Sequence, residues 1–349
     1  MNCGGVRSPP PPGRVRPALT EDALVAAIRE ICEVPAAQAP RPRAIALGIG
    51  DDAAAWQPSR SHLSVITSDA LVDGVHFRSD RMDPRAIGHR SMAANLSDIA
   101  AMGARPRLAT IVLGIASQTT EAWILELYRG LQQLAGRAGA TIAGGDIVRA
   151  PAAMLSITLV GEVSRSRMKR RSGGRPGDVL ATTGKLGASR AGLELMQRSL
   201  AVDETARAAA GAAFATPEPR LREGRWLGAS ANVHAMIDCS DGLSTDVARL
   251  ARASGCGAEI DRIPVADAAI AVARAATDDA YAYALHGGED YELIVAVAAR
   301  AFGHLANGFK KHFGRPLEPV GHLTSEPGLR LVDSGERSEL VPAGWDHFS

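Results

Sequence analysis

The sequence predicts a two-domain α/β protein of the α+β type. Apolar segments typical of strands alternate along its 349 residues with segments that have the 3.6-residue period of amphipathic helices. The length suffices for two domains, each with its own core. A basic, glycine-rich stretch at 164–178 separates two halves, so we expect domains at 18–163 and 164–349, preceded by a disordered proline-rich extension at 1–17.

The first half begins with a helix and two strands. A helix is expected from Thr20 to before Pro35, because the acidic pair at 21–22 suits its positive end. A short strand at 44–50 and a longer one at 62–72 follow, and the longer one carries the sequence TSD at its end.

A long helix is predicted next, with Asp83 as N-cap, Pro84 as first residue and Gly103 as its stop. On it Ser91, Asn95 and Asp98 share one stripe beside an apolar stripe, so we expect Asp98 at the edge of a packed face. The half closes with strands at 107–115, 140–150 and 153–163 and a helix at 120–139.

The second half repeats the strand and helix pattern. A strand at 178–184 runs into a helix that includes 188–196, and a strand ending near Cys239 precedes a helix rich in apolar positions. Strand alternation places Asp238 and Ser240 on one face and Cys239 on the other, where it packs. A capping role for Ser240 and Asp241 at the following helix is an open alternative to a functional one.

Composition excludes several classes of function. Lys and Arg number 39 against 38 Asp and Glu, and aromatic residues make up 4%, so no basic or stacking surface for nucleic acid is indicated. No apolar run is long enough for a membrane span. The four cysteines form no C-x-x-C pair, which favours a reduced, cytoplasmic protein.

Acidic residues recur in short clusters among Gly, Ser and Thr. Neighbouring carboxylates repel by roughly 1 kcal/mol at 4 Å in water and roughly 4 kcal/mol at a surface-like effective dielectric, so a cation is expected among them. Oxygen ligands without clustered His or Cys suit Mg²⁺ bridging phosphates, although each cluster alone is compatible with capping. The clusters are GIGDDAA at 48–54, TSD at 67–69, NLSD at 95–98, GGD at 144–146 and IDCSD at 237–241.

Two nucleotide-binding motifs are excluded by spacing. GIG at 48–50 has Ala53 where a dinucleotide fingerprint has its third glycine, and two aspartates would repel a pyrophosphate. Lys185 follows a glycine, but the upstream glycine of a P-loop is misplaced. The basic run at 164–178 is either a solvated hinge or the source of an arginine that clamps phosphate.

Taken in order, a series of motifs from residue 20 onward resembles the thiamine-monophosphate kinase family, within the wider aminoimidazole ribonucleotide synthetase-like superfamily. The motifs are GIGDDAA, TSDALVDGVHF, NLSDIAAMGARP, GGD, RRSGGRPGD, IDCSDGL, GGEDYEL and GWDHF. The resemblance implies a homodimer in which strands of the N-terminal domain form a shared barrel, with ATP bound in a cleft nearby. It also implies phosphorylation of thiamine monophosphate to thiamine diphosphate with several Mg²⁺ ions.

Matching motifs assign roles to individual residues. The implied metal ligands are Asp52, Thr67, Ser68, Asp69, Asp98, Asp146, Asp238 and Asp241, and Asp52, Asp98, Asp146, Asp238 and Asp241 among them are the expected catalytic residues. The implied ATP contacts are Gly145, Asp146, Arg171 and Ser240. The implied substrate contacts are His76, Glu289 and Trp345, whose aromatic ring suits a cationic thiazolium.

The expected mechanism is direct transfer. A phosphate monoester has a second pKa near 6, so at pH 7 most of the acceptor is already a dianion and needs no general base. The alternatives are another ATP-using reaction of the superfamily, or a metal-binding dimer without turnover.

Overall fold

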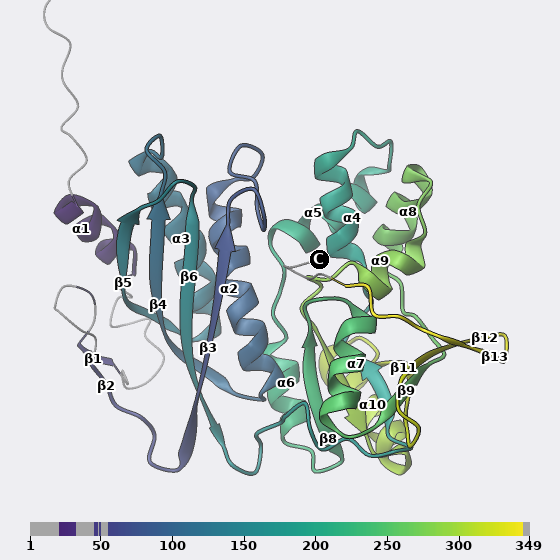
Figure 1. Ribbon diagram of the computed structural model, residues 1–349. Helices are drawn as coiled ribbons and strands as arrows, with labels where there is room; N and C mark the ends of the chain where they lie inside the picture. Colours follow the sequence, from purple (N-terminus) through teal and green to yellow (C-terminus); the bar gives the residue numbers. More distant parts are fainter. Residues whose placement is uncertain (1–20, 33–44, 48, 50–54, 345–349) are drawn as a thin grey trace, which may run out of the picture.

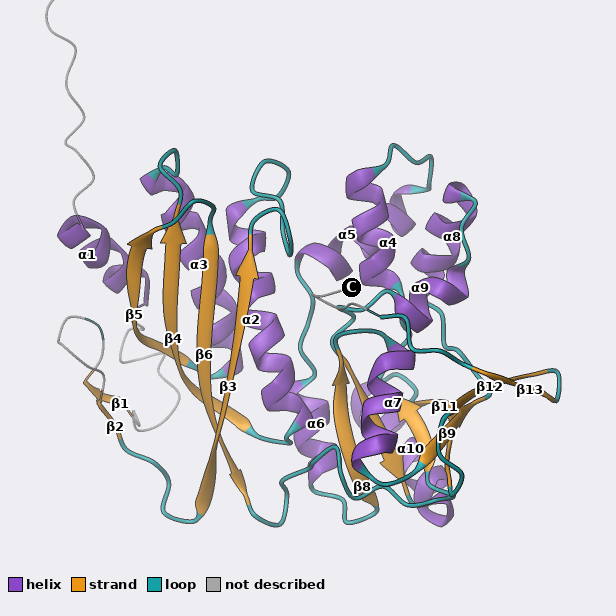
Figure 2. Cartoon of the chain, in the orientation of Figure 1, coloured by secondary structure: helices purple, strands orange, loops and turns teal. Residues whose placement is uncertain are grey.

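Two separate β-sheets, one in each half of the chain, organise the computed structural model (Figure 1). The structure describes residues 21–32, 45–47, 49 and 55–344. The predicted extension at 1–17 lies outside this part of the chain. The mixture of helices and strands confirms the predicted fold class (Figure 2).

The N-terminal half contains a four-stranded sheet in the order β3-β6-β4-β5. Its strands are β3 (His62–Val72), β4 (Arg105–Ile115), β5 (Thr141–Arg149) and β6 (Met154–Ser164), and a separate small sheet pairs β1 (Ile45–Leu47) with β2 (Ala55–Trp56). Only β4 and β5 are parallel, because α3 (Glu121–Ala138) connects them as a crossover helix.

Helices cover one face of this sheet and leave the other open (Figure 1). The covering helices are α1 (Glu21–Cys32), α2 (Pro84–Ala101) and α3, whose apolar side chains join the sheet in one core. On the open face Ile66, Val112 and Val148 are exposed. The open face therefore carries exposed apolar side chains that the described residues of this chain leave uncovered.

Helix α2 forms as its sequence predicts. The Asp83 side chain accepts a hydrogen bond from the Arg85 N–H, Pro84 is the first helical residue, and Gly103 adopts φ +66° just beyond the end. Met92, Leu96 and Ile99 are buried, while Asp98 is partly exposed, which confirms its predicted place at the edge of the packed face.

The C-terminal half contains a seven-stranded sheet in the order β13-β12-β9-β11-β7-β10-β8. The strands are β7 (Val179–Thr182), β8 (Val233–Cys239), β9 (Gly257–Ile260), β10 (Glu292–Val297), β11 (Glu318–Thr324), β12 (Leu329–Asp333) and β13 (Glu336–Glu339). Pairing is antiparallel except between β9 and β12.

Helices pack on both faces of this sheet. On one face lie α7 (Leu243–Ala253) and α9 (Ala280–His286), and on the other α6 (Leu221–Gly228) and α10 (Ala299–Phe313). A further group joins α4 (Ala188–Gln197), α5 (Glu204–Ala215) and α8 (Asp267–Ala276) with α9 through small apolar side chains. No helix of the described residues is long and apolar enough to cross a membrane.

The predicted strand at 62–72 is confirmed as β3, although TSD lies within it and not at its end, because the alternation continues through Ala70 and Leu71. The capping alternative is excluded. Ser240 and Asp241 do not cap the next helix, since α7 begins at Leu243 after Gly242, without any side-chain cap. Cys239 is buried in the sheet core, as predicted.

Candidate active site

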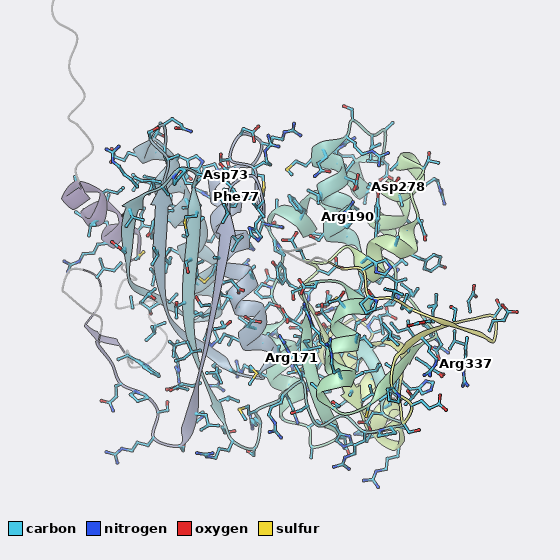
Figure 3. All side chains as sticks on the ribbon, viewed as in Figure 1. Asp73, Phe77, Arg171, Arg190, Asp278 and Arg337 are labelled. Atoms are coloured by element: carbon cyan, nitrogen blue, oxygen red, sulfur yellow. The ribbon has the colours of Figure 1, made fainter. Side chains whose placement is uncertain are left out.

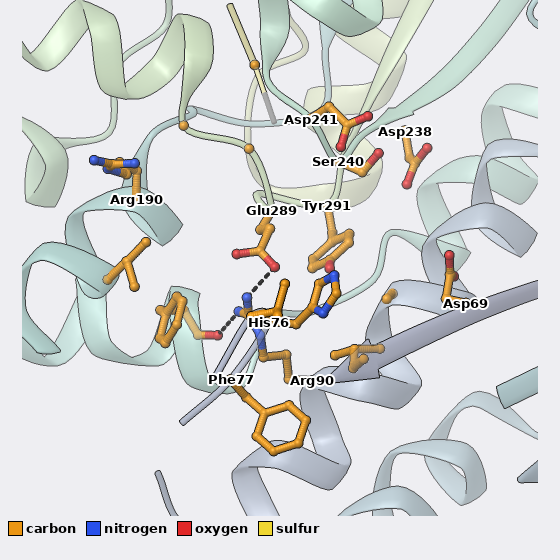
Figure 4. Close-up of a pocket in the computed structure, with 18 of the residues that line it drawn as sticks. Asp69, His76, Phe77, Arg90, Arg190, Asp238, Ser240, Asp241, Glu289 and Tyr291 are labelled. Atoms are coloured by element: carbon orange, nitrogen blue, oxygen red, sulfur yellow. Dashed lines mark hydrogen bonds and ion pairs between the residues drawn. The ribbon is translucent and has the colours of Figure 1, made fainter. Parts of the chain in front are cut away.

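A cavity of about 870 Å³ lies between the two halves and collects most of the predicted site residues (Figure 4). Its walls come from β3, the loop after it and α2 in the first half, and from α4, the end of β8 and the loop at 287–291 in the second. Ten predicted residues line it: Thr67, Ser68, Asp69, His76, Asp98, Arg171, Asp238, Ser240, Asp241 and Glu289.

Strand β3 and helix α2 bring the first two acids together. The Thr67 hydroxyl donates to Oδ2 of Asp98, and alternation along β3 turns Asp69 to the same side. Burial, followed by the charges of Asp98 and Asp241, raises the pKa of Asp69 to about 6. Ser68 projects from the opposite face of β3, where its hydroxyl lies 3.2 Å from Oγ1 of Thr158.

Asp238 supplies a buried carboxylate from the end of β8. It is 3% exposed, and the hydroxyl of Ser97 on α2 donates to its Oδ2 at 2.8 Å. Burial, then repulsion from Asp98 and Asp246, raises its pKa well above the usual range, while Ser97 and Arg171 oppose that shift. Asp238 has no ion pair among the described residues, so its charge is left for a cation from outside the chain to balance.

Asp246, in the first turn of α7, organises the turn that follows β8. Oδ2 of Asp246 accepts the N–H groups of Ser240 at 3.0 Å and Asp241 at 2.9 Å. Arg249 pairs with Asp241 and, at 3.0 Å, with Asp246. The turn thus presents Ser240 and Asp241 to the cavity without using either as a cap.

The loop after β3 carries His76 to the cavity. The Val72 N–H donates to Nδ1 of His76 at 3.1 Å, which places the ring proton of the neutral imidazole on Nε2. Asp73 braces the loop by accepting from the N–H and the hydroxyl of Ser79. Figure 3 shows Asp73 and Phe77 on this loop, across from Arg190 on α4.

Arg171 lies within the basic stretch at 164–178 and is exposed at the junction of the halves (Figure 3). Its positive charge lowers the pKa of both Asp98 and Asp238, although burial dominates and leaves both raised. No ion pair to Arg171 is found within the described residues. The guanidinium is therefore placed to meet an anion beside the acids.

Gly145 and Asp146 stand apart from the cavity. Both lie on β5, at the edge of the sheet opposite to β3, and the Asp146 side chain is exposed. A Cβ at Gly145 would meet the Ile111 carbonyl oxygen at 1.9 Å, so close strand approach explains this glycine. Asp52 and Trp345 lie outside the described residues, but Gly344 lines the cavity.

Several cavity residues were missed by sequence reasoning, notably Arg90, Arg190, Arg249 and Tyr291. Arg90 had a usable signal, because it is an arginine on a helix whose neighbouring positions are apolar or small, and such a charge requires a partner. The others carry no local signal, since their positions at the cavity depend on how the two halves pack.

The chemistry of the acids suits a divalent cation that arrives with phosphate. Asp69, Asp98 and Asp238 form no ion pair among the described residues, and burial raises the pKa of each. The described residues nevertheless form no group of three His, Cys, Asp or Glu side chains able to hold a metal alone. Mg²⁺ commonly binds one or two carboxylates and completes its shell with water and phosphate oxygens, so the donor set fits.

Comparison with known proteins gives consistent matches over both halves. Residues 50–163 match the family described as AIR synthase related protein, N-terminal domain, and residues 175–334 its C-terminal domain. Thiamine-monophosphate kinase of Escherichia coli K12 is 36% identical over 313 residues, covering 87% of this chain and 93% of that protein.

Solved structures agree. Thiamine-monophosphate kinase from Stenotrophomonas maltophilia is 34% identical with a TM-score of 0.79, covering 92% of this chain and 98% of that one. A structure described as AaThiL complexed with AMPPCP and TMP is 28% identical with a TM-score of 0.73, covering 83% of this chain and 89% of that one.

Proposed function

Because the chain belongs to the thiamine-monophosphate kinase family, we propose that it transfers the γ-phosphoryl group of ATP to the phosphate of thiamine monophosphate, giving thiamine diphosphate and ADP. One observation carries this proposal beyond family membership. The cavity between the halves gathers carboxylates without cationic partners beside an exposed arginine, which is the arrangement that phosphate bound with a divalent cation requires.

Within this proposal the acids are the ligands of Mg²⁺. Asp69, Asp98, Asp238 and Asp241, with Thr67 and Ser68, would hold Mg²⁺ at this cavity. The family motifs add Asp52, which lies outside the described residues, and Asp146, which does not line this cavity, as further proposed ligands. When bound, Mg²⁺ would neutralise the negative charge of the phosphate groups during transfer. The hydrogen bonds from Thr67 and Ser97 support these roles by fixing one oxygen each of Asp98 and Asp238.

Nucleotide and acceptor are proposed to approach the acids from different sides. Arg171 and Ser240, with Gly145 and Asp146, would contact ATP, and the guanidinium of Arg171 would pair with its phosphates. His76, Glu289 and Trp345 would contact thiamine monophosphate. The placement of His76 and Glu289 on the cavity that holds the acids supports their assignment to the acceptor.

Transfer is proposed to be direct, without a phospho-enzyme. The acceptor phosphate is mostly a dianion at pH 7, so the chain needs to orient it and to screen its charge but not to deprotonate it. Trapping phosphate on the protein during turnover would refute this step.

A homodimer is proposed through the open face of the four-stranded sheet. Exposed Ile66, Val112 and Val148 on this face support the proposal, because a second chain packed there would remove their apolar surface from water. Asp146 pairs with Val112 in register and therefore shares this face. Its distance from the cavity of its own chain is explained if assembly brings it to a second cavity.

We also propose a cytoplasmic location. Cys32, Cys239 and Cys256 are buried free thiols, which suits a reducing compartment.

The test is incubation of purified protein with Mg²⁺ and ATP, and with either thiamine monophosphate or thiamine, followed by chromatography. Thiamine diphosphate formed from the monophosphate alone is expected. ATP consumption with a different superfamily substrate, or metal binding without any turnover, would overturn the proposal.

A further inference from the structure

Arg90 is a buried arginine at the cavity that the proposed chemistry does not yet use. Its side chain is 1% exposed and lies on α2, two helical turns before Asp98. A buried guanidinium is costly unless it is paired and hydrogen-bonded. The groups that contact Arg90 therefore indicate which residue it positions.

Three contacts across the two halves satisfy most of the guanidinium. Nη1 donates to the Phe214 carbonyl at 2.6 Å, the Phe214 ring lies 4.2 Å from Cζ, and Nη2 pairs with Oε1 of Glu289 (Figure 4). Nε has no hydrogen-bond partner among the described residues. Phe214 thus fixes the position of the guanidinium, and Glu289 is the one carboxylate that it binds in the described part of the chain.

Glu289 lies in a loop of unusual backbone conformation. Gly288, Glu289 and Tyr291 all have positive φ, at +68°, +58° and +50°, a region that residues with a Cβ rarely adopt. Such a conformation persists only where surrounding contacts determine it.

Contacts from neighbouring elements hold the loop on its other sides. The Glu289 N–H donates to the Ser240 carbonyl at 2.7 Å, and the Tyr291 N–H to the Cys239 carbonyl at 3.0 Å. The Asp290 carboxylate accepts the N–H of Gly187 at 2.8 Å, at the start of α4. These contacts fix the backbone, whereas the Glu289 side chain is oriented by Arg90.

We propose that Arg90 is a positioning residue for the phosphate acceptor, acting through Glu289. The guanidinium binds Oε1, and Oε2 accepts no hydrogen bond from the described residues. The Glu289 side chain is 31% exposed and lines the cavity, so Oε2 remains for a ligand. This inference rests on the proposed function, in which Glu289 contacts thiamine monophosphate.

The geometry limits the effect to one substrate. Arg90 touches no described acid of the proposed metal cluster, so its loss should affect the acceptor and spare ATP. Because the charge of Glu289 is already balanced, the carboxylate would contribute a directed hydrogen bond more than long-range attraction.

The test compares Arg90→Met, Arg90→Lys, Glu289→Gln and the double variant in full-length protein, with KM measured separately for thiamine monophosphate and ATP. Arg90→Met should raise KM for thiamine monophosphate roughly 10- to 100-fold, the range for a charge-assisted hydrogen bond, and leave KM for ATP within about twofold. Arg90→Lys should recover part of the loss. The double variant should match Glu289→Gln, because Arg90 acts through that residue.

Arg220→Met is the matched control, since Arg220 pairs with buried Glu292 away from the cavity. It should lower the melting temperature without changing either KM. A KM for thiamine monophosphate that is unchanged in both Arg90 variants, equal effects on both substrates, or additive losses in the double variant would overturn the inference. Failure of the wild-type protein to form thiamine diphosphate would instead overturn the proposed function and, with it, the acceptor assigned to Glu289.

Discussion

Asp238 and Glu292 are buried carboxylates on neighbouring strands, and their surroundings shift their pKa values in opposite directions. Asp238 pairs in register with Leu293, and Glu292 with Cys239, so the two acids project from opposite faces of the sheet. Burial acts to raise the pKa of Glu292, but Arg220 and Arg315 overcome it and hold that pKa below its usual value. The pKa of Asp238 is raised, since burial is joined there by repulsion from Asp98 and Asp246.

The difference separates an acid whose charge the chain itself balances from an acid that we propose to bind a metal ion. Glu292 receives two hydrogen bonds from Arg220 and one from Thr183, so the chain itself completes its environment. Asp238 receives one from Ser97 and faces the cavity. Burial alone therefore does not indicate a functional site, whereas burial without an ion pair among the described residues marks a candidate for one.

The largest effect on turnover is expected from removing a cavity acid that has no ion pair among the described residues. Asp98→Ala should lower kcat at least about a thousandfold, since several kcal/mol of charge stabilisation would be lost. The melting temperature of the metal-free protein should not fall, because repulsion with Asp238 is relieved. Turnover and circular dichroism measure the two effects, with exposed Asp267→Ala as control. Unchanged turnover would remove Asp98 from the site.

Breaking the compensated pair should have the reverse pattern. Arg220→Met leaves Glu292 buried without its main partner and should lower the free energy of unfolding by about 3–5 kcal/mol. Urea denaturation measures the loss, and KM for both substrates should stay as in the wild type. A stability loss below 1 kcal/mol would show that Arg315 alone compensates Glu292.

Asp69→Asn tests the comparison through pH. The folded-state pKa of Asp69, about 6, exceeds its ordinary value, so its contribution to stability is greatest at low pH and is lost as pH rises through about 6. The variant should therefore be more stable than metal-free wild type by about 1–3 kcal/mol at pH 8 and nearly equal to it at about pH 3, below the ordinary pKa of an aspartate. Thermal denaturation at both pH values measures this, and a difference independent of pH would contradict it.

Ser97→Ala should give the smallest change. It removes the hydrogen bond that Asp238 accepts inside the chain and should lower stability at pH 8 by about 1–2 kcal/mol. Urea denaturation of this variant and of Arg220→Met under the same conditions would compare the two losses in free energy of unfolding. An equal loss in both variants would erase the distinction between the two acids.

Local signals were enough to predict much of the fold and part of the site. The Asp83 and Pro84 start of α2 depends on neighbouring residues only, and so does the alternation that defines β3. The gathering of Asp69, Asp98 and Asp238 could be inferred because their motifs share one chemistry. Where each side chain points was harder to predict, as Ser68 on the far face of β3 shows.

Long-range contacts account for what the sequence did not predict. Arg90 meets Glu289 across 199 positions, and no local pattern encodes such a pair. The capping interpretation of Ser240 and Asp241 was wrong because Asp246 takes their N–H groups and Gly242 delays the helix. The residue types in the sequence indicated the chemistry of the site, whereas the interaction partners of each side chain depended on tertiary packing.

Helix α2 also constrains how the molecule can move. Its Ser97 and Arg90 each contact the second half, one at Asp238 and the other at Glu289 and Phe214. A hinge motion that separated the halves along α2 would break both connections together and leave a buried guanidinium unpaired. The halves should therefore move as one body on the side of α2. Ligands should enter and leave the cavity past segments of its rim that do not contact α2.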